Sequence, residues 1–113
     1  MENFNPSLDT AFRALSDATR RAVISRLMQG PARVKDLAGP FDMGLPAFLK
    51  HLRVLEKSGL IATEKSGRIR TCRISPQWLL EAETWLSAQR AIWEASADRL
   101  AGFVETGMTE EDE

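Results

Sequence analysis

The spacing of apolar residues predicts a series of short helices over the first half of the chain. Apolar side chains recur there at intervals of three and four, the period of an amphipathic helix. The expected helices cover residues 6–15, 18–28, 34–38 and 44–58. A polar or glycine-containing break follows each of them, as at Gly30 and Gly39.

The second and fourth of these helices have the clearest boundaries. Asp17 is a good N-cap for the second, because its carboxylate can accept a hydrogen bond from an N–H of the first turn. We expect the inward residues of this helix to be Ala18, Ala22, Val23, Leu27 and Met28. The expected buried stripe of the fourth helix is Leu45, Phe48, Leu52 and Leu55. Its first turn tolerates Pro46, and Gly59 suits a left-handed position just beyond its end.

After Gly59 the apolar period changes from 3.6 to 2, which predicts β-strands. Residues 60–65 and 68–74 flank Ser66 and Gly67, so we expect a two-stranded hairpin with a tight turn at these two residues. In the second strand Arg68, Arg70 and Cys72 fall on one face, which must therefore tolerate charge. The bases near the turn are expected at a solvated tip.

A long final helix is expected from Ser75 and Pro76, which read as its N-cap and first residue. Its apolar residues again recur at intervals of three and four, and three large residues widen the stripe: Trp78, Trp85 and Ile92. This is more apolar surface than one short domain covers by itself. We expect one domain over residues 1–106, followed by an acidic, disordered tail over residues 107–113 that has little to pack.

Composition is that of an ordinary globular protein. The 113 residues suffice for one compact core, and 43% hydrophobic with 27% charged residues is typical of such domains. The sequence contains neither an apolar run of the roughly 18 residues that a membrane span needs nor a signal peptide at its start, so we expect a cytoplasmic protein without a membrane partner. The single Cys72 and single His51 are too few for a closed zinc site, and no metal or other cofactor is expected.

The net charge of −1 conceals an uneven distribution of charged residues. Residues 33–73 contain nine Lys or Arg and four Asp or Glu, a local charge of +5. Residues 105–113 contain five acids and no base. A basic middle beside an acidic end points to a nucleic-acid surface, although charge runs are often no more than solvated faces.

The order of the expected elements predicts a mainly α fold with a small β-hairpin, the winged helix-turn-helix. In that fold the second helix of the pair, here residues 44–58, lies in the major groove of double-stranded DNA and the hairpin forms a wing. Lys50 can donate to guanine, and Ala47 or Pro46 can pack on a thymine methyl group. The candidate DNA-binding residues are Lys35, Gly44, Pro46, Ala47, Lys50, His51, Arg53, Lys57, Lys65, Arg68 and Arg70.

Three segments closely resemble the ArsR (SmtB/ArsR) family of bacterial winged-helix repressors. They are residues 12–27 (FRALSDATRRAVISRL), 50–61 (KHLRVLEKSGLI) and 67–74 (GRIRTCRI). The resemblance implies a sequence-specific transcriptional regulator, a repressor, that binds a palindromic operator as a homodimer paired through its first and last helices. The implied dimer-interface residues are Leu8, Phe12, Leu79, Trp85, Leu86, Trp93, Leu100 and Phe103.

The chain departs from the pattern of the family in two places. It has no cysteine around residues 33–38, where metal-sensing members carry ligands, and no histidine on the last helix, so it resembles a subgroup that does not sense metals. The segment 44–49 has no serine or threonine, which relatives use to contact DNA. Trp78, Trp85 and Trp93 can line a cavity for an unknown small apolar inducer between the last helices, or simply fill an interface.

Other functions remain open at this point. A winged-helix protein-interaction module without DNA binding is the alternative, favoured by the acidic end and the serine-poor fourth helix. An enzyme is not expected, because no nucleophile and base or paired acids fall together. For Cys72 a redox-sensing role competes with that of a small, inert hydrophobic residue. For the wing bases, DNA contact competes with protection of an exposed strand edge.

Overall fold

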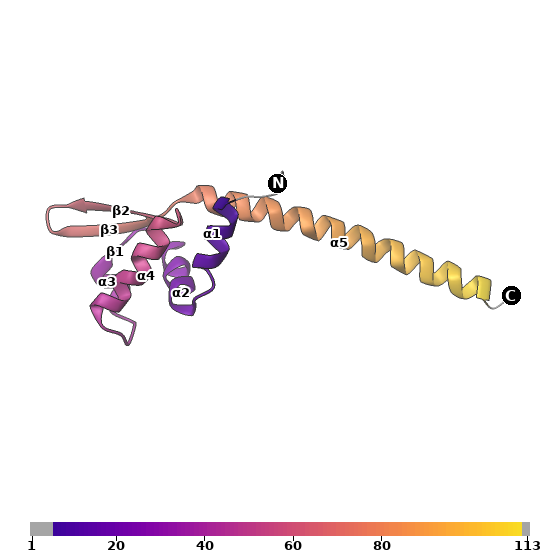
Figure 1. The fold of residues 1–113 in the computed structure, drawn as a ribbon, viewed down its shortest axis with the longest axis horizontal. Coiled ribbons are helices and arrows are strands. Elements are labelled where there is room, and N and C mark those ends of the chain that lie inside the picture. The colour runs from indigo at the N-terminus through magenta and orange to yellow at the C-terminus, as the bar shows by residue number, and fades with distance from the viewer. Residues whose placement is uncertain (1–5, 112–113) are drawn as a thin grey trace. The chain divides into compact units, whose positions relative to one another are not determined.

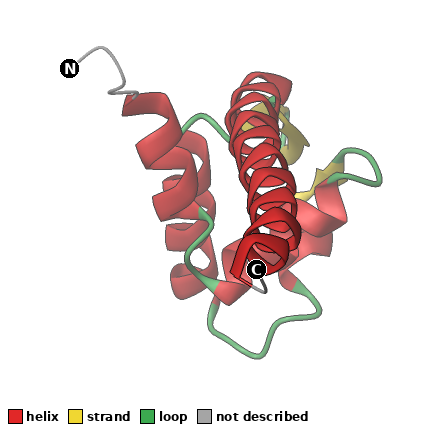
Figure 2. Cartoon of the chain, turned by 90° about the vertical axis from the view of Figure 1, so that its right-hand side faces the viewer, coloured by secondary structure: helices red, strands yellow, loops and turns green. Residues whose placement is uncertain are grey.

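The structure, a computed structural model, describes the backbone of residues 6–111 and the side chains of residues 7–104. Helices make up most of it, and the strands are confined to one small sheet (Figure 2). The chain divides into two compact units, Met1–Glu81 and Ala82–Glu113. The first unit holds the short helices and the sheet, and the second is formed by the rest of the last helix.

The elements follow the order of a winged helix-turn-helix (Figure 1). The helices are α1 Pro6–Ala14, α2 Ala18–Leu27, α3 Val34–Ala38, α4 Leu45–Lys57 and α5 Pro76–Glu111. The strands are β1 Ala32–Arg33, β2 Ile61–Ser66 and β3 Ile69–Ile74. The helix-turn-helix is therefore α3 and α4, and the wing is the hairpin of β2 and β3. The predicted fold class is confirmed.

The ends of the helices agree with the sequence signals. An Asp17 carboxylate oxygen accepts the backbone N–H of Arg20 at 3.0 Å, which makes Asp17 the N-cap of α2. Gly59 has φ +80°, the left-handed conformation that lets the chain leave α4 abruptly. The last helix begins at Pro76, where a missing N–H costs no intrahelical hydrogen bond.

One hydrophobic core holds the first unit together. Its largest fully buried side chains come from α2, α4 and the sheet region: Val23, Phe48, Leu55, Leu60 and Cys72. The predicted buried face of α2 is only partly right. Val23, Ile24 and Leu27 are buried, whereas Ala18, Ala22 and Met28 are exposed. Leu45, expected inside, is 55% exposed at the start of α4.

The sheet contains a short strand that the sequence pattern does not reveal. The strand order is β1-β3-β2, and all pairs are antiparallel. Ala32 and Arg33 of β1 pair with Cys72 and Thr71 near the base of the hairpin. Two residues are too few to show a period, so this strand exists only because β3 offers a free edge.

The turn of the hairpin lies one residue further along than predicted. Ser66 pairs with Ile69, so the two loop residues are Gly67 and Arg68, not Ser66 and Gly67. Gly67 has φ +63°, and Arg68 is not among the residues with positive φ. A two-residue loop with positive φ only at its first position is a type II′ turn, which requires glycine there.

The last helix extends beyond residue 106, where the sequence pattern predicts that it ends. We expected a tail without structure from residue 107 onward, but α5 extends through Gly107 to Glu111. Residues 112–113 of that tail lie outside the described residues. The proposed domain over residues 1–106 also spans the division of the chain after Glu81.

Candidate nucleic-acid interface

The exposed face of α4 carries most of the predicted DNA-reading residues. Phe48, Leu52 and Leu55 point into the core, which turns the rest of the helix outward. The predicted residues exposed on or next to α4 are Gly44, Pro46, Ala47, Lys50, Arg53 and Lys57. Pro46 lies in the first turn, as predicted, whereas Gly44, expected within the helix, is its N-cap residue.

His51 differs from the other predicted residues of α4 because it is partly buried. Its Nδ1 lies 3.3 Å from Nη1 of Arg20 and 3.7 Å from a carboxylate oxygen of Asp17. When neutral, the ring accepts a hydrogen bond from Arg20; when protonated, it forms an ion pair with Asp17. These contacts tie α4 to the start of α2 and occupy one nitrogen of the ring.

Arg20 and Asp17 are themselves held by backbone groups. Nε of Arg20 donates to the carbonyl oxygen of Ala14 at 2.6 Å, and Nη2 donates to that of Arg13 at 3.4 Å, so Arg20 also satisfies carbonyl groups at the end of α1. The backbone N–H of Arg20 lowers the pKa of the Asp17 carboxyl, and the nearby charges of His51 and Arg20 add to this effect. Asp17 is therefore ionised at neutral pH.

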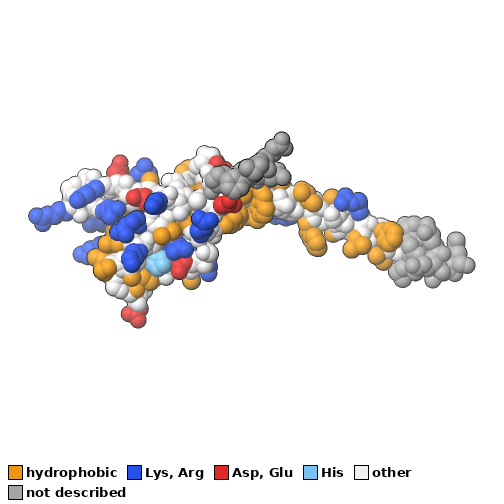
Figure 3. All heavy atoms as spheres, viewed as in Figure 1, with side chains coloured by type: hydrophobic (Ala, Val, Ile, Leu, Met, Phe, Trp, Pro, Cys, Tyr) orange, Lys and Arg blue, Asp and Glu red, His pale blue; other side chains and the backbone are white. Residues whose placement is uncertain are grey.

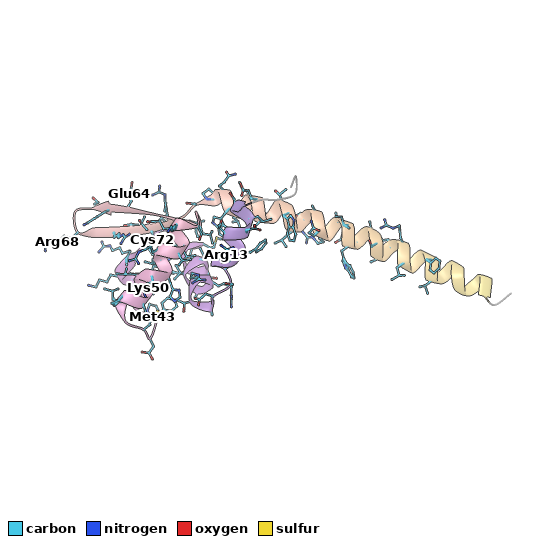
Figure 4. The ribbon with its side chains drawn as sticks, in the orientation of Figure 1. Arg13, Met43, Lys50, Glu64, Arg68 and Cys72 are labelled. Carbon is cyan, nitrogen blue, oxygen red and sulfur yellow. The ribbon has the colours of Figure 1, made fainter. Side chains whose placement is uncertain are left out.

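The wing presents a second group of positive charges. Lys65, Arg68 and Arg70 are all exposed near the turn of the hairpin. Figure 4 shows Arg68 at the tip and Lys50 on α4. Closer to the base of the hairpin, Arg73 forms an ion pair with Glu64 across the two strands at 3.7 Å, and both side chains are exposed to solvent. This pair adds little stability, but it neutralises one of the bases that the sequence counts.

The structure brings Lys35 together with two of the wing residues. Lys35 of α3 lines the same groove as Arg68 and Arg70, and so do Leu45 and Leu49 of α4. Figure 3 shows Lys and Arg side chains gathered over the hairpin and the short helices, with apolar patches between them. Lys35, Arg68 and Arg70 are among the residues predicted from the sequence, whereas the apolar side chains between them are not, because the groove joins residues far apart in the chain.

Cys72 lies in the core at the base of the hairpin. Its side chain is fully buried, and this burial raises the pKa of the thiol. A protonated, inaccessible thiol is a poor nucleophile, so the environment favours the inert role over the sensing role. Among the residues that the structure describes, no three His, Cys, Asp or Glu side chains are placed to hold a metal ion.

Large apolar side chains are exposed along α5. Most of the predicted dimer-interface residues are exposed: Phe12, Leu79, Trp85, Leu86, Trp93, Leu100 and Phe103. Leu8 is partly buried. Leu79, Leu86, Trp93 and Leu100 are spaced at intervals of seven, and Phe103 follows Leu100 by three, as in a coiled-coil seam. A hollow of about 560 Å³ beside Trp93 and Leu100 lies on this face.

Comparison with known proteins identifies the family. Residues 17–63 match the model of the bacterial regulatory protein, arsR family. The HTH-type transcriptional regulator Rv2034 of Mycobacterium tuberculosis is 37% identical over 78 residues, which cover 69% of this chain and 73% of that protein. The chain belongs to the ArsR family.

Two further relatives of this ArsR-family chain agree with that assignment. The arsenical resistance operon repressor of Escherichia coli is 31% identical over 72% of this chain and 74% of its own length. A crystal structure of an ArsR family transcriptional regulator is 52% identical, with a TM-score of 0.74, and the match covers 78% of this chain and 97% of that one.

The family places the chain among transcriptional regulators with a winged helix-turn-helix DNA-binding domain. These relatives are named as transcriptional regulators or as a repressor, in agreement with that family. Within the described part of the chain, no helix combines the length and hydropathy needed to cross a membrane.

Proposed function

We propose that this ArsR-family regulator is a repressor that binds a palindromic operator as a homodimer. The observation that carries the proposal is the joint exposure of basic residues on α4 and the wing, on two elements of one unit. A duplex can meet both elements at once, with α4 in the major groove and the wing beside it. The repressor role follows the name of the E. coli relative.

Different exposed side chains are candidates for contacts to DNA bases and to phosphate groups. Lys50 has a donor at the centre of the outward face of α4 and is the candidate for reading guanine. Arg53 and Lys57, further along α4, are candidates for phosphate contacts. The basic wing residues Lys65, Arg68 and Arg70 are further candidates. Gly44, Pro46 and Ala47 give the start of α4 a small, apolar surface for close approach to bases. His51, held by Arg20, orients α4 more than it reads DNA.

The apolar face of α5 supports the homodimer. Trp93 is 71% exposed and Phe103 is 73% exposed, and burial of such side chains is worth roughly 1.5–3 kcal/mol each. The seven-residue spacing allows the helices of two copies to pair along their length. A homodimer carries two α4 helices, which favours an operator with two half-sites about 34–36 Å apart.

The test combines selection of bound DNA with measurement of association. Selection from random duplexes should recover inverted repeats with half-site centres about one helical turn apart. Sedimentation should show a dimer at micromolar concentration. If three to five Lys or Arg side chains of each subunit contact phosphate, a plot of log affinity against log salt concentration should have a slope of about −5 to −9.

The controls separate DNA binding from dimerisation. A chain that is dimeric but shows a salt slope near zero is a protein-interaction module, and the proposal is then wrong. Recovery of single half-sites without symmetry contradicts the palindromic operator. Activation of a reporter by the bound protein, instead of reduced transcription, contradicts the repressor role.

A further inference from the structure

A groove of about 600 Å³ lies between the helix-turn-helix and the wing, within the first unit. Apolar side chains of α3, the linker and α4 line it: Val34, Ala38, Met43, Leu45 and Leu49. Positively charged side chains complete the lining: Lys35 from α3, and Arg68 and Arg70 from the wing. Its volume is within the roughly 300–1,000 Å³ of small-molecule sites.

The charge of this groove has one sign. None of the described residues that line it is acidic, although Asp36 and Asp42 are sequence neighbours of the lining residues Lys35 and Met43. The groove therefore offers an apolar surface and a positive potential in the same place. A ligand that fits both has an apolar chain and one anionic head.

Other occupants satisfy only half of this lining. A phosphodiester strand pairs with Lys35, Arg68 and Arg70 but leaves side chains such as Leu45, 55% exposed, without an apolar partner. A neutral lipid covers the apolar side chains but leaves the guanidinium groups without an acceptor. A carboxylate head suits arginine in particular, because guanidinium and carboxylate can form two parallel hydrogen bonds.

We propose that this groove binds a single-chain carboxylate of medium length, of which decanoate is a suitable probe, and that the ligand displaces DNA. The carboxylate engages Arg68, Arg70 and Lys35, and the chain lies on Leu45, Leu49 and Met43. Displacement follows because the same three cations are candidates for DNA contact. The binding of the ligand stands by itself, whereas the displacement of DNA rests on the proposed function.

Methyl NMR on the full-length protein tests the location of binding directly. Met43 lines the groove, and Met28, exposed on the surface, is the matched reporter. Decanoate, kept below its critical micelle concentration and without DNA, should shift the methyl resonance of Met43 and leave that of Met28 unchanged. Decyltrimethylammonium and decanol, which have the same chain without the negative charge, should bind at least tenfold more weakly. Equal binding of all three probes, or no shift at Met43, overturns the proposal.

Two variants locate the site, one at Ala38, which packs against the core, and one at the exposed Arg70 of the wing. Ala38→Leu adds a larger side chain to the groove lining and should weaken decanoate binding at least tenfold, whereas Ala22→Leu, an equivalent change at an exposed position of α2, should not. Arg70→Gln, an exposed substitution that does not disturb the core, should also weaken decanoate tenfold or more. Unchanged affinity in Ala38→Leu and Arg70→Gln alike refutes the site.

Competition is measured last, with a labelled operator duplex and fluorescence anisotropy. Decanoate should lower the operator affinity of the wild-type chain at least tenfold and that of Ala38→Leu much less, each compared with the same chain without decanoate. If decanoate binds and operator affinity stays constant, ligand binding is retained and displacement is wrong. If no duplex binds even without decanoate, the proposed function fails, while the NMR result still decides the ligand site.

Discussion

The contacts of Asp17 predict a measurable loss of stability when its side chain is removed. Asp17→Ala deletes the acceptor for the Arg20 N–H at 3.0 Å and the partner of His51 at 3.7 Å. Loss of an N-cap costs about 1 kcal/mol, within a range of roughly 0.5–2. The side chains of His51 and Asp17 are 24% and 35% exposed, so solvent screens their ion pair, which adds less than about 1 kcal/mol.

Asp17→Asn is the matched variant that separates these two contributions. Its side-chain oxygen still caps α2, but it carries no charge for His51 or Arg20. We expect Asp17→Ala to lower the free energy of unfolding by about 1–1.5 kcal/mol at pH 7 and Asp17→Asn by less than about 0.5. Asp98→Ala, an acid-to-alanine change at an exposed position of α5, should change it by less than about 0.5.

The effect of Asp17 should also depend on pH with a definite sign. Its folded-state pKa is lowered, so its contribution to stability is present above the ordinary pKa of an aspartate and is lost as pH falls through the folded value. Urea unfolding followed by circular dichroism, at constant protein concentration between pH 3 and pH 7, measures this. A stability difference between wild type and Asp17→Ala that does not shrink at the acid end of this range, where the carboxyl becomes protonated, or an Asp17→Ala variant as stable as wild type at pH 7, would refute the reasoning.

Four further changes test other parts of the structure. Lys50→Ala should reduce discrimination between operator and random duplex by about 1–3 kcal/mol in competition assays, and an equal loss on both would mean a phosphate contact. Arg68→Gln removes one phosphate contact from each subunit of a dimer. It should therefore make the slope of log affinity against log salt concentration shallower by about 1.8, measured by titration at several ionic strengths. Trp93→Glu should shift the sedimentation of the protein toward that of a monomer, while its circular dichroism spectrum still shows a folded first unit. Cys72→Ser should lower the free energy of unfolding by about 1–3 kcal/mol, and peroxide should leave operator binding of wild type unchanged.

The elements of the fold could be predicted wherever the chain carries local signals. Asp17, Gly59 and Pro76 mark the boundaries of helices through their own backbone chemistry, and the structure places those boundaries there. The turn of the hairpin was predicted one residue early. The error has a physical cause, because only the first loop residue of the observed turn has positive φ and only Gly67 adopts it easily.

Features that depend on distant partners could not be predicted. The apolar residues of α2 surround much of the helix, so packing against α4 and β3 selects Ile24 over Ala18 and Met28. The strand β1 needs β3, 38 or more positions later in the chain, before it exists. His51 meets Arg20 across 31 residues, which no local period indicates. The apolar lining of the groove beside the wing was missed for the same reason.

The alternation of residues in β3 also shows what a pattern leaves out. Arg70 and Cys72 share a face by period, yet Cys72 is fully buried and Arg70 is exposed. The core covers only the base of the hairpin, so one face is apolar at one end and solvated at the other. The position along a strand therefore matters as much as the side of it.

Because of the strand order β1-β3-β2, the inner half of the wing is held more firmly than the outer half. At Thr71 and Cys72, β3 is bonded on both edges, whereas at Ile69 and Arg70 it has β2 as a neighbour on one edge only. Amide hydrogens should therefore exchange slowly at the root and faster toward Gly67. The outer half is a two-stranded ribbon that can bend and twist to follow the contour of a surface. The root, where β3 also pairs with β1, keeps its position against the helices.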